Sequence, residues 1–382
     1  MNNFIFQNPV KLIMGRGTIA LLTKEIPADK RILITFGGGS VKKNGVYDQV
    51  TEALKNHNTV EFWGIEPNPS IETLRKAIEL GKQEKTNFLL AVGGGSVADG
   101  TKLIAAGLLY KGDAWDLVKL RKPITDTVPM ATVMTLPATG TEMNRNAVIS
   151  RYETKEKYGI AANYPVFSIL DPETTFSLPQ NQIAYGIVDT FVHIMEQYLT
   201  VTGVSRPMDR WAEGLLQTLV EIAPKIIDNP TDYNLMSDYM LSSTLALNGF
   251  IALGGVPQDW ATHQIGHELT ALHGLAHGHS LAIVLPGTMN VLRAKKGDKI
   301  IQYGERIWKI KEGNRNERIG KTIIKTNEFF RSLGLTTHLS EEGIGYETVN
   351  EIERRFNERK VAFGENANVT GAVAKLILQD RL

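Results

Sequence analysis

Most of the histidines in this chain fall within one short segment. Residues 257–279 contain five of the eight. His263 and His267 are four residues apart, a spacing that stacks two imidazoles on one face of an α-helix, so either could bind a metal ion. On a continuous helix, His277 would lie about 21 Å further along the axis than His263, which is too far for the two histidines to share a metal ion. The helix must therefore end between them, and Gly274 is the residue at which the chain can turn back.

A carboxylate and another histidine share the same spacing upstream. Asp189 and His193 are four residues apart in an apolar amphipathic segment, so both side chains point the same way. With His263 and His277 they make a set of three imidazoles and one carboxylate. Such a set suits catalytic Fe(II) or Zn(II) with one position open for substrate. A lone histidine on an apolar helix is usually a hydrogen-bonded core residue, but two such pairs together favour a metal site.

The tetrapeptide Gly-Gly-Gly-Ser occurs twice, 56 residues apart, each time after a predicted strand. Glycines at a strand-to-helix turn let backbone N–H groups approach a phosphate at the positive end of the helix dipole. Lys42 and Ala98 stand where the dinucleotide fingerprint G-x-G-x-x-G has its third glycine, so neither copy is that fingerprint. A single glycine triplet is often only a tight turn, whereas two equivalent copies favour a dinucleotide. The first copy is Gly37, Gly38, Gly39 and Ser40, and the second is Gly93, Gly94, Gly95 and Ser96.

Residues 1–178 alternate between strand and helix patterns, which predicts an α/β, Rossmann-like dinucleotide-binding domain with a parallel sheet covered on both faces. Residues 179–382 show apolar spacing of three and four, which predicts a helical metal-binding domain. Prolines in the segment 171–179 mark the boundary. A cleft between two such domains is a common place for ligands. The predicted strands are 31–36, 60–65, 88–92, 130–136 and 166–170, and the predicted helices of the first domain include 46–56, 71–85 and one that opens at Ser96.

The composition of the chain excludes several classes of ligand and site. The formal net charge is +1, from 42 basic and 41 acidic side chains. The chain therefore lacks the excess of positive charge that is typical of proteins that bind nucleic acid or an anionic membrane. The absence of cysteine excludes disulfides and cysteine-ligated metals. No window approaches the roughly 18 apolar residues of a membrane helix, and the N-terminus lacks a signal-peptide pattern. We therefore expect a cytoplasmic protein that binds small-molecule ligands.

With these residues assembled, the chain resembles the iron-containing (group III) alcohol dehydrogenases over nearly its whole length. Within that family it is similar to the NADP-dependent aldehyde reductase and butanol dehydrogenase branch, whose first loop has Gly-Gly-Gly-Ser followed by two lysines. The resemblance rests on the second glycine loop with Asp99, on Leu136–Glu142, on Leu170–Pro172, on Asp189 with His193, and on His263, His267 and His277.

The resemblance implies a metal-dependent, homodimeric enzyme that transfers hydride between NADP(H) and an aldehyde or primary alcohol. His267 would lie beside the nicotinamide without binding the metal. Lys157 is a weaker match for a ribose contact, because its surroundings depart from the family's usual run. The implied metal ligands are Asp189, His193, His263 and His277; the pyrophosphate would be held by Gly94, Gly95 and Ser96, and the rest of the cofactor lined by Thr135, Leu136, Thr139 and Leu178.

The residues of the first glycine loop predict which nicotinamide cofactor, NADPH or NADH, is preferred. NAD-using relatives commonly have an acidic side chain where this chain has Gly39, and that acid would repel a 2′-phosphate. Here Gly39 leaves room for the phosphate, Ser40 can donate to it, and Lys42 and Lys43 supply positive charge. We therefore expect NADPH to be preferred over NADH.

The sequence also bears on three alternative functions. The sequence His267-Glu268 suggests a zinc hydrolase, but the H-E-x-x-H motif needs a histidine where the chain has Ala271. An NAD-dependent polyol dehydrogenase of the same superfamily is the nearest alternative, and a non-enzymatic nucleotide-binding module is a third. The sequence leaves the aldehyde and the choice between iron and zinc open.

Overall fold

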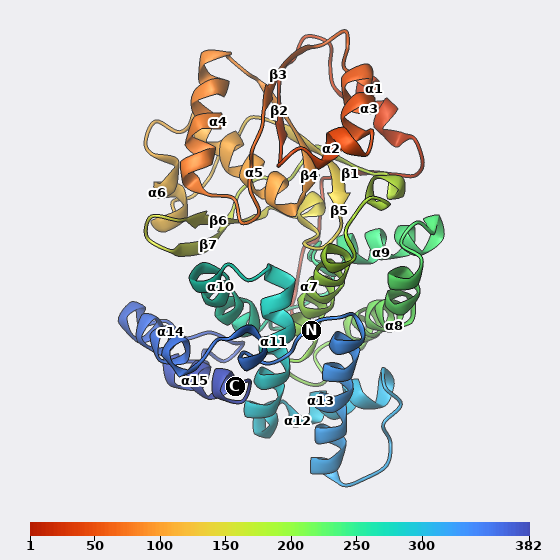
Figure 1. The fold of residues 1–382 in the computed structure, drawn as a ribbon, viewed down its shortest axis with the longest axis vertical. Coiled ribbons are helices and arrows are strands. Elements are labelled where there is room, and N and C mark those ends of the chain that lie inside the picture. The colour runs from red at the N-terminus through yellow and green to blue at the C-terminus, as the bar shows by residue number, and fades with distance from the viewer. The chain divides into compact units, whose positions relative to one another are not determined.

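The computed structural model describes residues 1–382, which form two compact units (Figure 1). The sheet unit comprises Gln7–Leu178 and Pro230–Thr244, and the helical unit comprises Met1–Phe6, Pro179–Asn229 and Leu245–Leu382. The chain passes from the sheet unit to the helical unit after Leu178. Two short segments, Met1–Phe6 and Pro230–Thr244, do not belong to the same unit as the residues next to them in sequence. None of the helices has the length and apolar character needed to cross a membrane.

A six-stranded, wholly parallel sheet forms the centre of the sheet unit, with strand order β1-β8-β5-β4-β2-β3. The five predicted strands are all present. Apart from the half-buried edge strand at 58–62, their near-continuous apolar runs are typical of parallel strands that are covered on both faces. The four-residue edge strand β1 was not predicted. The strands are β1 (Lys11–Met14), β2 (Arg31–Phe36), β3 (Asn58–Phe62), β4 (Phe88–Gly94), β5 (Met130–Leu136) and β8 (Phe167–Leu170).

Helices cover both faces of this sheet (Figure 1). The helix α5 is buried along nearly its whole length. Ser70 begins α4 by accepting a hydrogen bond from the backbone N–H of Thr73 at 3.3 Å. One face carries α4 (Ile71–Gln83), α5 (Gly95–Leu109) and α6 (Ala114–Lys119); the other carries η1 (Thr18–Leu21), α1 (Leu22–Glu25), α2 (Ser40–Lys43) and α3 (Val46–Ala53).

An antiparallel hairpin, β6 (Asn146–Arg151) and β7 (Glu156–Ala161), lies apart from the main sheet and was not predicted. Its alternation is weak because polar residues occupy the outer face while only a few positions reach the core. Ile149 of β6 is fully buried in the apolar core that also includes α5.

The helical unit contains no named strand, as the sequence predicted. Helices α10, α11, α14 and α15 share one apolar core. Most of α9 lies in the sheet unit, where the hydroxyl of Tyr239 donates to the carbonyl of Pro137 at 2.5 Å. The helices are α7 (Gln180–Tyr198), α8 (Arg206–Asp228), α9 (Tyr233–Ala246), α10 (Ala261–His273), α11 (His277–Val291), α12 (Arg293–Arg306), α13 (Arg315–Ser332), α14 (Tyr346–Arg359) and α15 (Gly371–Gln379), with short turns η2 (Thr141–Met143), η3 (Pro172–Thr175) and η4 (Ser340–Glu342).

Candidate active site

Two glycines allow the three histidine-bearing helices α7, α10 and α11 to approach one another closely. A Cβ atom on Gly278 would overlap the carbonyl oxygen of Tyr185 in α7, and one on Gly266 would lie 2.9 Å from the Ser280 hydroxyl in α11. Between α10 and α11 the chain turns at Gly274, which has φ of 70° and donates to the carbonyl of Thr270 at 2.9 Å. The predicted turn at this glycine is confirmed, and it reverses the chain so that α11 can begin beside α7.

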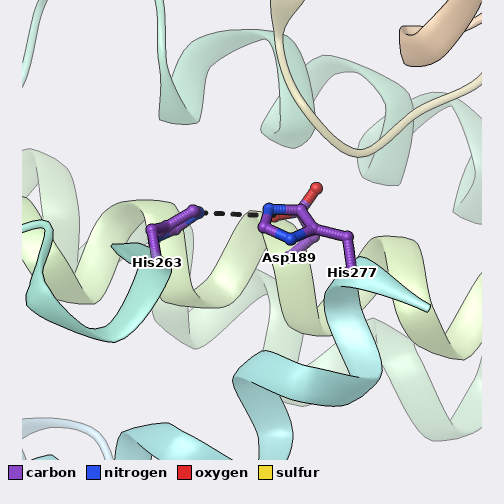
Figure 2. Close-up of side chains that lie close together, drawn as sticks. All are labelled: Asp189, His263 and His277. Carbon is purple, nitrogen blue, oxygen red and sulfur yellow. Dashed lines mark ion pairs between the residues drawn. The ribbon is translucent and has the colours of Figure 1, made fainter. Parts of the chain in front are cut away.

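Asp189, His263 and His277 meet at the point where these helices converge (Figure 2). The Asp189 Oδ1 atom lies 3.6 Å from Nε2 of His263 and 3.6 Å from Nε2 of His277. These distances are too long for hydrogen bonds of normal length. They are close to the roughly 3.4 Å that separates two donors bound to one ion at about 2.1 Å in tetrahedral geometry.

Burial supports the same interpretation of this cluster. Asp189 is 3% exposed and His263 is 6% exposed. The Asp189 Oδ1 and His263 Nε2 atoms are buried without a hydrogen-bond partner, an arrangement that is costly for polar atoms unless another ligand satisfies them. One carboxylate among imidazoles is a donor set that fits Fe(II) or Zn(II).

His193 and His267 lie at the edge of this cluster. The Nδ1 atom of His193 is 3.5 Å from Asp189 Oδ1, and its ring centroid is 4.6 Å from that of His263. Its ring nitrogens are nevertheless not among the donors that all lie within 4.8 Å of one another, so His193 remains a predicted fourth ligand. The ring of His267 is buried, with its centroid 5.2 Å from that of His277. It therefore lies beside the cluster, and its place beside the nicotinamide remains a prediction.

The two remaining histidines of the segment, His273 and His279, contact threonine hydroxyls. The Nε2 atom of His273 is 2.8 Å from the hydroxyl of Thr348, and that of His279 is 2.6 Å from the hydroxyl of Thr336. These contacts pair both histidines with threonines and not with a residue of the Asp189 cluster. They give neither histidine a place in the candidate site.

Glu196 is a site residue that the sequence analysis missed. Its Oε2 atom contacts Nδ1 of His263. Burial alone would lower the pKa of His263, but the carboxylates of Glu196 and Asp189 outweigh burial and raise that pKa to about 9. A signal was present in the sequence, because Asp189, His193 and Glu196 follow one another at spacings of four and three on one face of α7.

In the sheet unit, the second glycine loop comprises the last two residues of β4 and the first two of α5. A Cβ atom on Gly95 would lie 2.6 Å from the Thr139 hydroxyl, and one on Gly94 would lie 3.1 Å from Cβ of Leu136. The structure thus brings Leu136 and Thr139, both predicted from the resemblance, directly against the loop. The first backbone N–H groups of α5 have no partner within the helix, which makes this end a suitable place for a phosphate.

Lys157 reaches this loop through a residue that the sequence did not suggest. Its Nζ atom donates to Oδ1 of Asn68 at 2.8 Å, and the backbone N–H of Asn68 donates to the Ser96 hydroxyl at 3.2 Å. Asn68 has φ of 57°, a left-handed conformation that asparagine tolerates better than most residues. The predicted contacts Ser96 and Lys157 are therefore linked in space, although 61 residues separate them in sequence.

Asp99 has both carboxylate oxygens engaged within the protein. Oδ1 accepts from the Thr141 hydroxyl at 2.6 Å, and Oδ2 accepts from the backbone N–H of Val148 at 2.8 Å. Beside it, the fully buried Nζ of Lys102 donates to the carbonyls of Thr141 and Asn146, each at 2.7 Å. These bonds fix the segment after β5 to α5 and so hold Thr139 over the glycine loop. Any direct contact of Asp99 with a cofactor remains a prediction.

Two more predicted cofactor residues, Thr135 and Leu178, also lie in the sheet unit. Thr135 is buried near the end of β5. Leu178 is half-buried, and its N–H donates to the carbonyl of Thr175 at 3.0 Å. Their cofactor contacts remain predictions.

The first glycine loop is more open than the second. Gly38 and Gly39 have no atom within 4 Å of an added Cβ, although Gly39 has φ of 97°. The Nζ atom of Lys42 lies 4.1 Å from the centre of the Trp63 ring, so a cation–π contact holds this lysine against the protein. Lys43 is exposed. Of the two lysines, Lys43 is thus the one more available to a ligand.

Comparison with known proteins assigns the family. The model of the iron-containing alcohol dehydrogenase family matches residues 9–172, and the model of its C-terminal region, the Fe-containing alcohol dehydrogenase C-terminal family, matches residues 183–378. The chain belongs to the iron-containing alcohol dehydrogenases and is an oxidoreductase.

Its relatives include enzymes with different nicotinamide cofactors. The chain is 48% identical to the NADPH-dependent aldehyde reductase YqhD of Escherichia coli (strain K12), over 99% of each chain. It is 42% identical to the probable NADH-dependent butanol dehydrogenase 1 of Bacillus subtilis (strain 168), over 92% of each. The crystal structure of Escherichia coli K-12 YqhD superposes with a TM-score of 0.97 and 48% identity, covering 100% of this chain and 99% of the other.

Proposed function

We propose that this protein is an NADP(H)-dependent aldehyde reductase and alcohol dehydrogenase that works with one divalent metal ion, Fe(II) or Zn(II). The proposed ligands are Asp189, His193, His263 and His277. The observation that carries the proposal is the convergence of three imidazoles on Oδ1 of Asp189 at 3.5–3.6 Å, in a chain 48% identical to an NADPH-dependent aldehyde reductase.

The reaction that fits this site is the transfer of a hydride and a proton to a carbonyl group. A divalent ion at these ligands would polarise the carbonyl oxygen, and bound NADPH would supply the hydride. The carbonyl carbon gains the hydride and the oxygen gains a proton, so that aldehyde, NADPH and one proton become alcohol and NADP⁺. We assign His267 to a position beside the nicotinamide, where its imidazole, or water, can pass that proton.

For the cofactor we propose that the two glycine loops have different tasks. The second loop, with Gly94, Gly95 and Ser96 at the start of α5, would hold the pyrophosphate. The first loop would accept the 2′-phosphate beside Gly39, which has no side chain, and near the exposed Lys43. This arrangement favours NADPH, as in the Escherichia coli relative, over NADH.

The partner proposed for the enzyme is a small aldehyde or primary alcohol, and we also propose, from the family resemblance, that the chain forms a homodimer. Sedimentation of the metal-loaded protein tests the dimer, which a monomer at micromolar concentration would disprove. The aldehyde that the enzyme prefers is to be identified by measuring activity with a panel of substrates.

The activity is tested by following NADPH absorbance in purified, metal-loaded protein with a panel of aldehydes. We expect NADPH to be consumed in equal amount to the alcohol formed, activity to disappear after chelation, and Fe(II) or Zn(II) to restore it. Turnover confined to NAD⁺ and polyols would favour the polyol dehydrogenase instead. Nucleotide binding without any turnover would favour a non-enzymatic binding module.

A further inference from the structure

One buried carboxylate contacts both a proposed metal ligand and the helix that carries it. Glu196 is 3% exposed. Its Oε1 atom accepts from the backbone N–H of Thr262 at 2.6 Å, and its Oε2 atom accepts from the backbone N–H of His263 at 3.2 Å. The same Oε2 atom contacts Nδ1 of His263. A residue of α7 therefore controls both the start of α10 and the orientation of one imidazole.

Glu196 caps the backbone N–H groups of Thr262 and His263 at the start of α10, while the Asp259 side chain accepts from the N–H of Ala261 at 2.8 Å. Trp260, at the N-cap position, makes no side-chain capping bond. The free N–H groups at a helix start are stabilised by an acceptor, and the positive end of the helix dipole by a negative charge. Glu196 supplies both from another helix. The carboxylate is consequently fixed by bonds to the backbone and cannot turn away from the imidazole without uncapping α10.

The surroundings also hold this carboxylate and imidazole in place. The backbone N–H of Asp259 donates to the carbonyl of Glu196 at 2.8 Å, and the Asp259 carboxylate pairs with buried Lys296 at 2.6 Å. Trp260 has φ of 61°, a strained conformation for a bulky residue, and its ring centroid lies 5.3 Å from that of His263. The structure thus constrains the His263 ring from several sides.

We infer that Glu196 is a positioning residue, which keeps the proton of His263 on Nδ1 and turns Nε2 toward the metal. This inference rests on the proposed function. An imidazole that donates from one nitrogen has its lone pair on the other, and a carboxylate acceptor both selects that tautomer and strengthens the ring as a ligand. In this structure, Nε2 is the His263 nitrogen that lies toward Asp189, at 3.6 Å.

The test measures the affinity of Co(II) for chelator-treated protein by competition with a coloured chelator. Glu196→Gln should weaken Co(II) binding by about 10- to 100-fold and change the visible spectrum of bound Co(II). The matched control is Glu213→Gln, which removes the charge of another buried glutamate of the helical unit. Glu213 Oε1 accepts a hydrogen bond from the hydroxyl of Tyr198 at 2.7 Å. The control should leave Co(II) affinity and spectrum unchanged. Equal losses in both variants would overturn the inference.

A double-mutant comparison separates positioning from general destabilisation. If Glu196 acts through His263, then Glu196→Gln should cause no further loss of Co(II) affinity in a His263→Ala background. An additional loss as large as in wild type would overturn the inference. Wild-type protein without affinity for any divalent ion would instead overturn the proposed function.

The wild-type protein gives a measurement that does not depend on a folded variant. In Zn(II)-loaded protein with ¹⁵N-labelled histidines, the signal of His263, assigned by its loss in His263→Ala, should show a protonated Nδ1 and a metal-bound Nε2. A protonated Nε2 would overturn the inference, because Glu196 would then not select the tautomer.

Discussion

Gly278 and Tyr185 are in contact through main-chain atoms, because the first turn of α11 lies directly against the carbonyl of Tyr185 in α7. A side chain at residue 278 would overlap that carbonyl. His277 is the neighbour of this glycine, and Asp189 is one turn after Tyr185 on the same helix. The close approach of two backbones therefore sets the distance between a proposed histidine ligand and a proposed carboxylate ligand.

Gly278→Ala should lower bound metal to a small fraction of the wild-type content, because α11 must move away from α7 to make room for the methyl group. We expect a loss of unfolding free energy of roughly 1–3 kcal/mol, as for other overpacked sites. The matched control is Gly320→Ala in α13, where an added Cβ meets nothing within 4 Å. Elemental analysis and urea unfolding decide the matter, and equal metal content in the two variants would contradict the prediction.

His263→Ala and His277→Ala should each lower metal content and activity together, because each removes a proposed ligand. His267→Ala should retain most of the metal but lower kcat by about 100-fold or more, since it would lose a proton-transfer group. Metal content and kcat are to be measured on the same preparations. If the His267→Ala protein proves as metal-poor as His263→Ala, then the division between ligand and proton-transfer group is wrong.

Gly95→Ala should weaken NADPH binding by about tenfold or more, because the new methyl group would displace Thr139, whose hydroxyl lies 2.6 Å from the Cβ position. Gly320→Ala in α13 is the control, since an added Cβ meets nothing within 4 Å at that position, which lies outside both glycine loops. Adding Thr139→Ala to Gly95→Ala removes the clash and should recover part of the affinity. Titration of NADPH fluorescence measures all three, and an undisturbed affinity in Gly95→Ala would show that the loop does not hold the pyrophosphate.

Gly39→Asp should shift the cofactor preference toward NADH, since a carboxylate there would repel the 2′-phosphate by on the order of 1–3 kcal/mol. Gly39 has φ of 97°, so any side chain adds backbone strain. Gly39→Asn carries the same strain without the charge and is therefore the proper control. The measurement is the ratio of kcat/KM for NADPH to that for NADH. A wild type that prefers NADH, or equal ratios in the two variants, would remove Gly39 from the explanation.

The stability of the protein should rise with pH between about 8 and 10.5 on account of Lys102. Burial lowers the pKa of Lys102 to about 8 from its usual 10.5, although the carboxylates of Asp99 and Glu142 oppose this effect. In that window the unfolded chain holds the proton and the folded chain does not, so removing protons favours folding by up to the order of 3 kcal/mol. Urea unfolding of wild type and Lys102→Met should show the rise only in wild type. Parallel pH dependence in both would contradict the prediction.

The sequence was informative wherever the signal is local. Apolar runs located five of the six strands of the parallel sheet, all but the edge strand β1, and the spacing of four residues placed Asp189 with His193 and His263 with His267 on helix faces. Gly274 marked the turn between α10 and α11. These features depend on residues within a few positions of one another, because the periods of helices and strands are properties of the local backbone.

Contacts between residues that are distant in sequence were visible only in the tertiary structure. Nothing in the spacing shows that Glu196 contacts His263 across 67 residues, or that Asn68 links Ser96 to Lys157. Asp99 belonged to a family motif, yet its bonds to Thr141 and Val148 give it a place inside the protein. Residues 230–244 join the sheet unit although helical segments surround them in sequence. Such pairings arise from close packing of distant elements, which the local pattern of apolar and polar residues does not specify.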